Sequence, residues 1–166
     1  MTFVGNDRVV HPLHGVGTVV RLVTRRFEAG AGRQYYEIVL SKGATIWVPV
    51  DGDEGGLRRL IARGELERYR SLLSGRPSAL ATDHKQRQIE VAARLKPGTL
   101  RARCEVVRDL TAHSWKKPLC QSSAALLRKA QQALEEEWSV VADQPLHEVT
   151  RQIQALLLEG RRAYDV

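Results

Sequence analysis

Short runs of alternating apolar and polar residues dominate the first third of the chain. Three runs rich in β-branched and aromatic residues are bounded by glycine, lysine or acidic residues: 18–27 (TVVRLVTRRF), 33–41 (RQYYEIVLS) and 45–50 (TIWVPV). A shorter run, 8–12, precedes them and leads into a glycine-containing turn at 14–17. This period of two predicts strands. Strands so short and closely spaced favour a small, strongly bent β-barrel.

Alternation within these strands also predicts which side chains face outward. Trp47 should point away from Ile46 and Val48, so it faces solvent if those two residues face the barrel interior. Two interpretations of Trp47 remain open, an exposed interface anchor and a residue packed under the helical half. Arg25 and Phe27 share one face of their strand. That face is predicted to carry these residues as well: Val19, Arg21 and Val23.

A loop of glycine and acidic residues, 51–56, separates the strand-rich part from the rest of the chain. After it, apolar residues recur with the spacing of helices. The sequence therefore predicts a β + α protein of two domains. The first, residues 1–56, is the β-barrel, and the second, residues 57–166, is an all-α helical bundle.

Capping residues and breakers divide the second domain into helices. The first is predicted over 57–73, with Gly64 splitting it. The next helix is predicted to start at the Asp83–Gln86 capping box, with an apolar stripe of Ile89, Ala92, Ala93 and Leu95, and another starts at Thr99, with Leu100, Cys104, Val107 and Leu110 on one face. A longer helix is predicted to start at Ser122 or Ser123, with a buried face of Leu126, Leu127, Ala130, Leu134 and Trp138. The last helix is predicted over 146–159 and ends at Gly160.

Charge adds a second level of organisation. The chain of 166 residues carries a formal net charge of +7, and the excess lies mainly in 76–117, which holds 10 Lys or Arg against 4 Asp or Glu. Such a concentration fits either a solvated helix face or a nucleic-acid footprint. The acidic run 135–137 is read as a solvated face. The absence of a long apolar run or a signal-peptide pattern predicts a cytoplasmic protein with no membrane partner.

Few residues suggest catalysis or metal binding. His11 and His14 have the spacing of half a metal site, but no second pair lies near them in the sequence. Cys104, His113 and Cys120 form no recognised catalytic motif, and Cys104 is predicted to be a buried apolar-like thiol. We therefore expect no catalytic residues, no metal and no cofactor. A Cys/His metalloenzyme is the weakest of three function classes, and elemental analysis tests it.

Residues from both halves resemble the CarD family of bacterial transcription regulators. The N-terminal stretch 3–17, FVGNDRVVHPLHGVG, is similar to that family's opening motif with one additional residue before Asp7. The strand at Tyr35-Tyr36 and the segment 48–50 also fit. In the helical half, 105–110 (EVVRDL) and 127–134 (LRKAQQAL) resemble two consecutive family helices.

The resemblance implies a Tudor-like or SH3-like barrel that binds the β subunit of bacterial RNA polymerase, a module shared with transcription-repair coupling factors. It also implies a helical domain that contacts promoter DNA at the upstream edge of the melted region and stabilises the open complex. Carried over by position, the polymerase-binding residues are Arg25, Phe27 and Trp47. The DNA-binding residues are His84, Lys85, Arg87 and Lys129. Such a protein is expected to act as a nucleoid-associated monomer.

One position departs from the family pattern. Many relatives carry a tryptophan near the start of the first C-terminal helix, used as a wedge in the minor groove, and His84 occupies that position. A histidine is a weaker wedge than tryptophan, so phosphate contacts gain importance. The residues expected to supply them without sequence readout are Lys85, Arg87, Arg94, Arg101 and Arg103. The alternative function is a polymerase-bound protein–protein adaptor that makes no direct DNA wedge.

Overall fold

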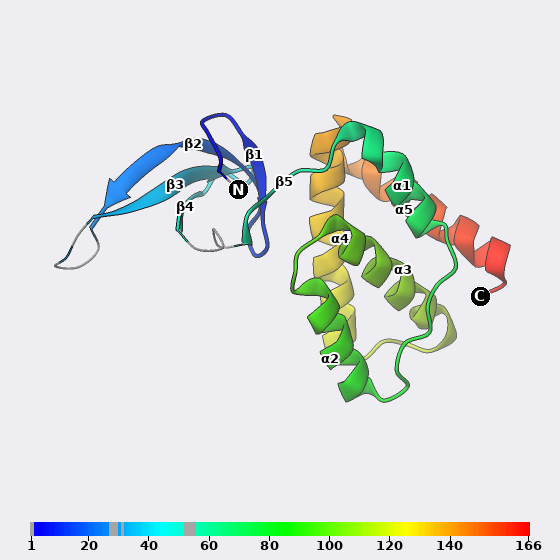
Figure 1. Cartoon of the computed structure of the whole chain (residues 1–166). Coiled ribbons are helices and arrows are strands. Elements are labelled where there is room, and N and C mark those ends of the chain that lie inside the picture. The colour runs from blue at the N-terminus through cyan, green and yellow to red at the C-terminus, as the bar shows by residue number, and fades with distance from the viewer. Residues whose placement is uncertain (1, 27–29, 31, 52–55) are drawn as a thin grey trace. The chain divides into compact units, whose positions relative to one another are not determined.

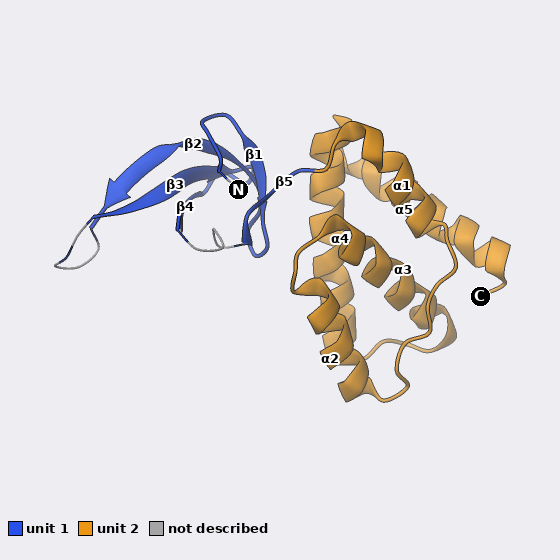
Figure 2. Ribbon diagram, viewed as in Figure 1, with its two compact units in different colours: residues 1–60 blue, residues 61–166 orange. Residues whose placement is uncertain are grey.

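The computed structural model describes residues 2–26, 30, 32–51 and 56–166. The chain forms two compact units, residues 1–60 and 61–166, which Figure 2 colours separately. Strands make up the first unit and helices the second (Figure 1). In the described residues, no helix combines the length and the apolarity required to cross a bilayer.

The first unit is a five-stranded antiparallel sheet. Its strands are β1 (Arg8–His11), β2 (Gly15–Arg25), β3 (Arg33–Leu40), β4 (Thr45–Pro49) and β5 (Arg58–Arg59), in the spatial order β4-β3-β2-β1-β5. The predicted barrel closure is wrong, because β4 and β5 are the two edges and no pairing joins them in the described residues. β5 has only two residues and pairs with β1, which leaves little strand for closing the sheet.

One face of the sheet forms its hydrophobic core. The buried residues are Phe3, Val9, Val19, Tyr36, Ile38, Leu40, Val48 and Leu57. Gly17 lies inside β2, not in the turn predicted for it, and a Cβ there would meet Ile38 Cγ2 at 2.6 Å. This glycine therefore permits close packing between β2 and β3, whereas Gly15 has a positive φ of 83°.

A bulge in β2 changes the predicted faces of that strand. The register with β3 shifts between Val19 and Arg21, which leaves Val20 as the additional residue. Val19 therefore faces the core, whereas Arg21 lies beyond the bulge opposite the half-buried Glu37. The prediction that Val19 and Arg21 share a face is wrong for this reason.

The end of the sheet unit also differs from the prediction. Residues 57–59 were expected to begin a helix, but Leu57 packs in the sheet core and Arg58–Arg59 pairs with β1. The compact units consequently meet at 60/61, four residues beyond the expected boundary. A short 3₁₀ helix, η2 (Arg63–Glu65), then leads into α1 (Leu66–Leu73), which agrees with the predicted interruption at Gly64.

Four further helices complete the second unit: α2 (His84–Leu95), α3 (Leu100–Lys116), α4 (Gln121–Ala142) and α5 (Leu146–Tyr164). Two predicted caps are confirmed. Asp83 accepts a hydrogen bond from the Gln86 amide, and Thr99 accepts one from the Ala102 amide. The predicted cap of α4 is wrong, since Cys120 precedes that helix. The predicted stop at Gly160 is also wrong, because α5 continues to Tyr164. Gly160 is instead a close-packing position, where a Cβ would lie 3.0 Å from the Ser74 carbonyl oxygen.

The helices share one core. The predicted face of α3 is confirmed, and Leu134 and Trp138 of α4 are fully buried. The predicted stripe on α2 is wrong: Val91 is buried beside Arg87, one turn earlier, whereas Ile89 is 64% exposed. Glu137 is also fully buried, so the acidic run 135–137 is not simply a solvated face.

Candidate functional site

A connected set of four side chains lies on the face of the sheet opposite its core. Glu37 of β3 is paired with Arg21 of β2 on one side and with Trp47 of β4 on the other. Its carboxylate accepts hydrogen bonds from Arg21 Nε at 2.8 Å and from Trp47 Nε1 at 3.2 Å. The Arg25 guanidinium carbon lies 4.5 Å from the centre of the Trp47 ring. These four residues are called the Trp47 network below.

The network combines an exposed aromatic surface with fixed charges. Trp47 is 38% exposed, which confirms the outward orientation inferred from alternation. A cation over an indole face is attracted by the ring quadrupole, so the contact orders the Arg25 side chain. The hydrogen bond from Arg21 is the largest cause that holds the pKa of Glu37 below its usual range. The carboxylate therefore stays charged at neutral pH and fixes the indole ring.

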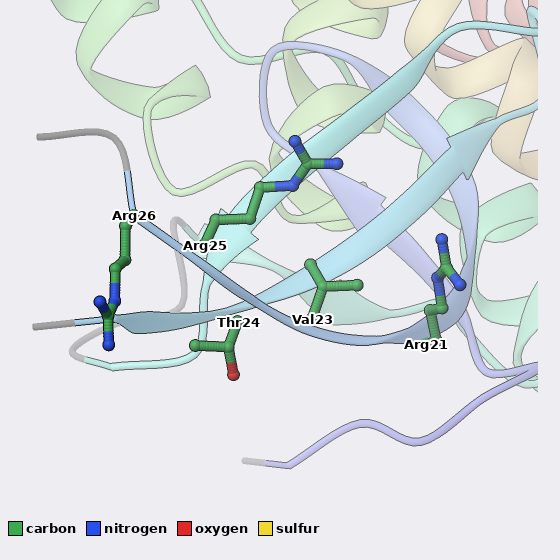
Figure 3. Close-up of a pocket in the computed structure, with 5 residues that line it drawn as sticks. All are labelled: Arg21, Val23, Thr24, Arg25 and Arg26. Atoms are coloured by element: carbon green, nitrogen blue, oxygen red, sulfur yellow. The ribbon is translucent and has the colours of Figure 1, made fainter.

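The two arginines of the network lie along one side of β2. Figure 3 shows Arg21, Val23 and Arg25 on one side of the strand, with Thr24 and Arg26 on the other, around a shallow open hollow. The alternation therefore separates Arg25 from Arg26 although they are neighbours in the chain. Phe27, predicted to accompany Arg25, lies outside the described residues.

Sequence reasoning found two of the four members of the network. Arg25 and Trp47 were predicted to share an outer surface, and they are in contact. Arg21 and Glu37 were missed as functional candidates. The strand register would have identified them, because it places Glu37 between Arg21 and Trp47 on neighbouring strands. A carboxylate in that position can order both side chains.

The predicted DNA-contacting residues have different environments. His84 and Lys85 are exposed in the first turn of α2, and Lys129 is exposed on α4. Arg87, by contrast, is only 5% exposed. Its Nη1 donates to the carbonyl oxygens of Ala81 and Thr82 at 3.0 and 3.3 Å. Arg87 thus fixes the segment before α2, and its guanidinium is not available to a phosphate.

Several other arginines of the basic segment form ion pairs within the helical unit. Arg94 contacts both Glu105 and the fully buried Asp109, at 3.3 and 3.1 Å. Arg103 is buried, with its Nη1 3.9 Å from Glu137. Burial argues against a phosphate contact by Arg103, whereas Arg94 is partly exposed and its phosphate contact stays a prediction. Arg101 also pairs with Glu105, at 2.8 Å, but its side chain is 74% exposed.

The histidine pair near the N-terminus has a local structural role. His11 Nδ1 accepts hydrogen bonds from the backbone amides of Leu13 and His14, at 3.0 and 3.2 Å. Burial and the neighbouring His14 lower the pKa of His11, which favours this neutral, accepting form. Within the described residues, no group of three or more histidine, cysteine or acidic side chains is arranged to hold a metal ion.

Comparison with known families gives two matches. Residues 3–61 match the CarD-like/TRCF RID domain, and residues 69–154 match the CarD C-terminal domain. The second match alone covers more than half of the chain. The chain belongs to the CarD family. Among curated proteins, no significant match is found.

CarD family proteins are non-enzymatic transcription regulators that interact with RNA polymerase. Their RID-type domain indicates interaction with the polymerase β subunit. The Trp47 network lies entirely in the part of the chain that matches this domain. His84, Lys85 and Lys129 lie in the part that matches the CarD C-terminal domain. The two groups of candidate residues thus belong to separate family domains.

Proposed function

We propose that this CarD family protein binds the RNA polymerase β subunit through the Trp47 network and contacts promoter DNA through its helical unit. The DNA contact lies at the upstream edge of the transcription bubble and stabilises the open complex. One observation carries the first part. An exposed tryptophan, ordered by Arg25 and Glu37, lies on the outer face of the RID-matched sheet.

The composition of the network suits a protein interface. Tryptophan and arginine are the residues most enriched among those that dominate binding energy. A side chain already held in place loses less conformational entropy on binding. Glu37 holds the ring nitrogen of Trp47 and Arg25 lies over the ring face, so the indole ring is presented in one orientation.

Charge reversal at Arg25 tests the polymerase part. We expect Arg25→Glu to remove the cation–π contact and to weaken binding to the β subunit at least 30-fold, about 2 kcal/mol. Arg26→Glu is the matched control, because it makes the same charge change on the other side of β2. Binding of purified β subunit is measured by interferometry. Equal weakening by both variants would indicate a general charge effect and contradict the proposed surface.

The DNA part rests on exposed cations of the helical unit. Lys85 lies in the first turn of α2 and Lys129 on α4, and both are exposed. Tethering to polymerase raises the local concentration of this unit near DNA, so weak and largely nonspecific contacts suffice. His84 is placed beside Lys85 and can stack or hydrogen-bond in a groove.

Lys85→Glu tests this contact. We expect it to weaken binding to upstream-fork promoter DNA several-fold and to reduce the slope of log K against log salt by about 1. Lys96→Glu, at the exposed end of the same helix, is the control. Salt-insensitive binding with no difference between the variants would favour the protein–protein adaptor, for which the internal pairing of Arg94 and Arg103 argues.

A further inference from the structure

Cys120 occupies the N-terminal cap of α4, a helix of 22 residues, and is half-buried. Its Sγ lies 3.4 Å from Ser122 Oγ and 3.3 Å from Ser123 Oγ. As a thiol, the sulfur donates to Ser123 Oγ. As a thiolate it would accept from both hydroxyls, because a hydroxyl hydrogen rotates to suit its partner. A helix N-terminus adds partial positive charge at this position, which favours the thiolate.

A buried cation provides independent support for an anion here. Arg87 is only 5% exposed, and its Nε has no hydrogen-bond partner in the described part of the chain. A buried donor without a partner is costly, and an anion nearby relieves that cost. The Arg87 side chain is also among the groups that lower the pKa of Cys120, after Ser122 and Ser123. The hydroxyls, the helix end and Arg87 therefore converge on one sulfur atom.

The pKa values of the two cysteines are shifted in opposite directions, by different causes. Hydrogen bonds from Ser122 and Ser123 are the largest causes that lower the pKa of Cys120 to about 6. Burial, followed by the charges of Glu137 and Glu105, raises the pKa of Cys104 far above its usual range. Cys104 is fully buried in the helical core. The chain thus contains one candidate reactive thiol and one inert internal control.

We propose that Cys120 is a redox-reactive thiolate that small hydroperoxides oxidise to a sulfenic acid. The sulfur attacks one peroxide oxygen, a sulfur–oxygen bond forms and the oxygen–oxygen bond breaks. The sulfur loses two electrons, and the leaving hydroxide or alkoxide takes a proton from solvent. Cellular thiols reduce the sulfenic acid by way of a mixed disulfide, which makes the modification reversible. Cys104 takes no part, because neither solvent nor peroxide reaches it.

Alkylation of the full-length protein tests the acidity of the site. Iodoacetamide is applied between pH 4.5 and 9, and mass spectrometry follows each cysteine-containing peptide. We expect the rate at Cys120 to reach half its maximum near pH 6, while Cys104 stays unmodified over the same time. The midpoint is diagnostic where the rate alone is not, because thiolates of low pKa are weaker nucleophiles. A midpoint at or above about 8.5, the value of an ordinary thiol, would overturn the proposal.

Two variants and a trapping reaction complete the test. Ser122→Ala removes one hydroxyl near the exposed end of α4 and should move the Cys120 midpoint upward, toward about 8.5. With hydrogen peroxide and dimedone, a sulfenic acid adduct should form at Cys120 of the wild-type protein. Cys120→Ser should give no adduct. Absence of the wild-type adduct, or an adduct formed equally at Cys104, would contradict the assignment.

Discussion

The arginines of the sheet unit and those of the helical unit serve different purposes. On the sheet, Arg21 and Arg25 are exposed, and their partners Glu37 and Trp47 belong to the same outer face. In the helical unit, Arg87 and Arg103 are buried: Arg87 donates hydrogen bonds to backbone carbonyls, and Arg103 forms an ion pair with the buried Glu137. Ordered cations at a surface are suited to recognition, whereas buried ones fix the packing of helices.

This difference changes how the basic charge of the chain is interpreted. The segment 76–117 has the largest excess of Lys and Arg, which favoured a broad nucleic-acid footprint. Burial of Arg87 and Arg103 removes two of its cations from the surface, and Arg103 is paired with Glu137, which lies outside the segment. Formal net charge therefore overestimates the positive surface available for DNA. The contrast can be tested by removing a buried partner, by altering an exposed contact and by titrating the sheet network.

Removing the Glu137 carboxylate should have the largest effect. Glu137→Ala leaves the buried Arg103 without its nearest carboxylate and removes the acceptor for the Ile61 amide. Breaking a buried pair on one side costs about 3 kcal/mol. We expect this loss in the free energy of unfolding of the helical unit, measured by urea denaturation followed by circular dichroism.

The neighbouring acidic run supplies the control for this prediction. Glu135→Ala changes a half-buried residue whose contact is a hydrogen bond from Gln131 on the same helix, so we expect a cost below about 1 kcal/mol. Binding to the β subunit should not change in either variant. Similar stability for both variants would show that burial of Glu137 contributes little, and the contrast between the two units would weaken.

Introducing a wedge at position 84 should have an intermediate effect. His84→Trp places a large apolar ring on the exposed first turn of α2, where it can unstack a base step. We expect the open-complex lifetime to increase several-fold, about 1 kcal/mol, in a competitor-challenge assay on promoter DNA. His147→Trp, in the first turn of α5, is a control for nonspecific stacking. An unchanged or shorter lifetime would place the groove contact elsewhere.

Periodicity predicted β1 to β4 and most helices, because each depends on neighbouring residues. It failed where distant segments decide the structure. Leu57, Leu60 and Ile61 have a spacing compatible with a helix, but pairing with β1 makes Arg58 and Arg59 a strand. The bulge after Val19 depends on the register with β3, which alternation along β2 alone does not contain.

The candidate residues show the same division. Alternation placed Trp47 on the outer face, and the structure agrees. Burial of Arg87 and Glu137 was not predicted, because a charged residue becomes buried only where another helix or loop supplies its partner. The importance of Glu37 similarly requires the register of three strands. The sequence therefore predicted the outer face of the sheet correctly, but it did not predict which charged residues are exposed to a binding partner.

Acid titration of Glu37 should give the smallest effect and resolve the sheet network directly. The pKa of Glu37 is lowered chiefly by the hydrogen bond from Arg21, so the charged form is favoured in the folded protein. A lowered carboxyl pKa means that the stabilisation is present above the ordinary value of 4.5 and is lost as pH falls through the lowered value. The chemical shift of the Trp47 indole proton should therefore stay constant from neutral pH down to about 4.5 and change only below that pH.

In Glu37→Gln this acid transition should disappear, while Trp115 and Trp138 serve as internal references. A transition of Trp47 at or above 4.5, or one that persists in Glu37→Gln, would mean that Glu37 does not hold the ring, and the interface would then depend on the Arg25 contact alone.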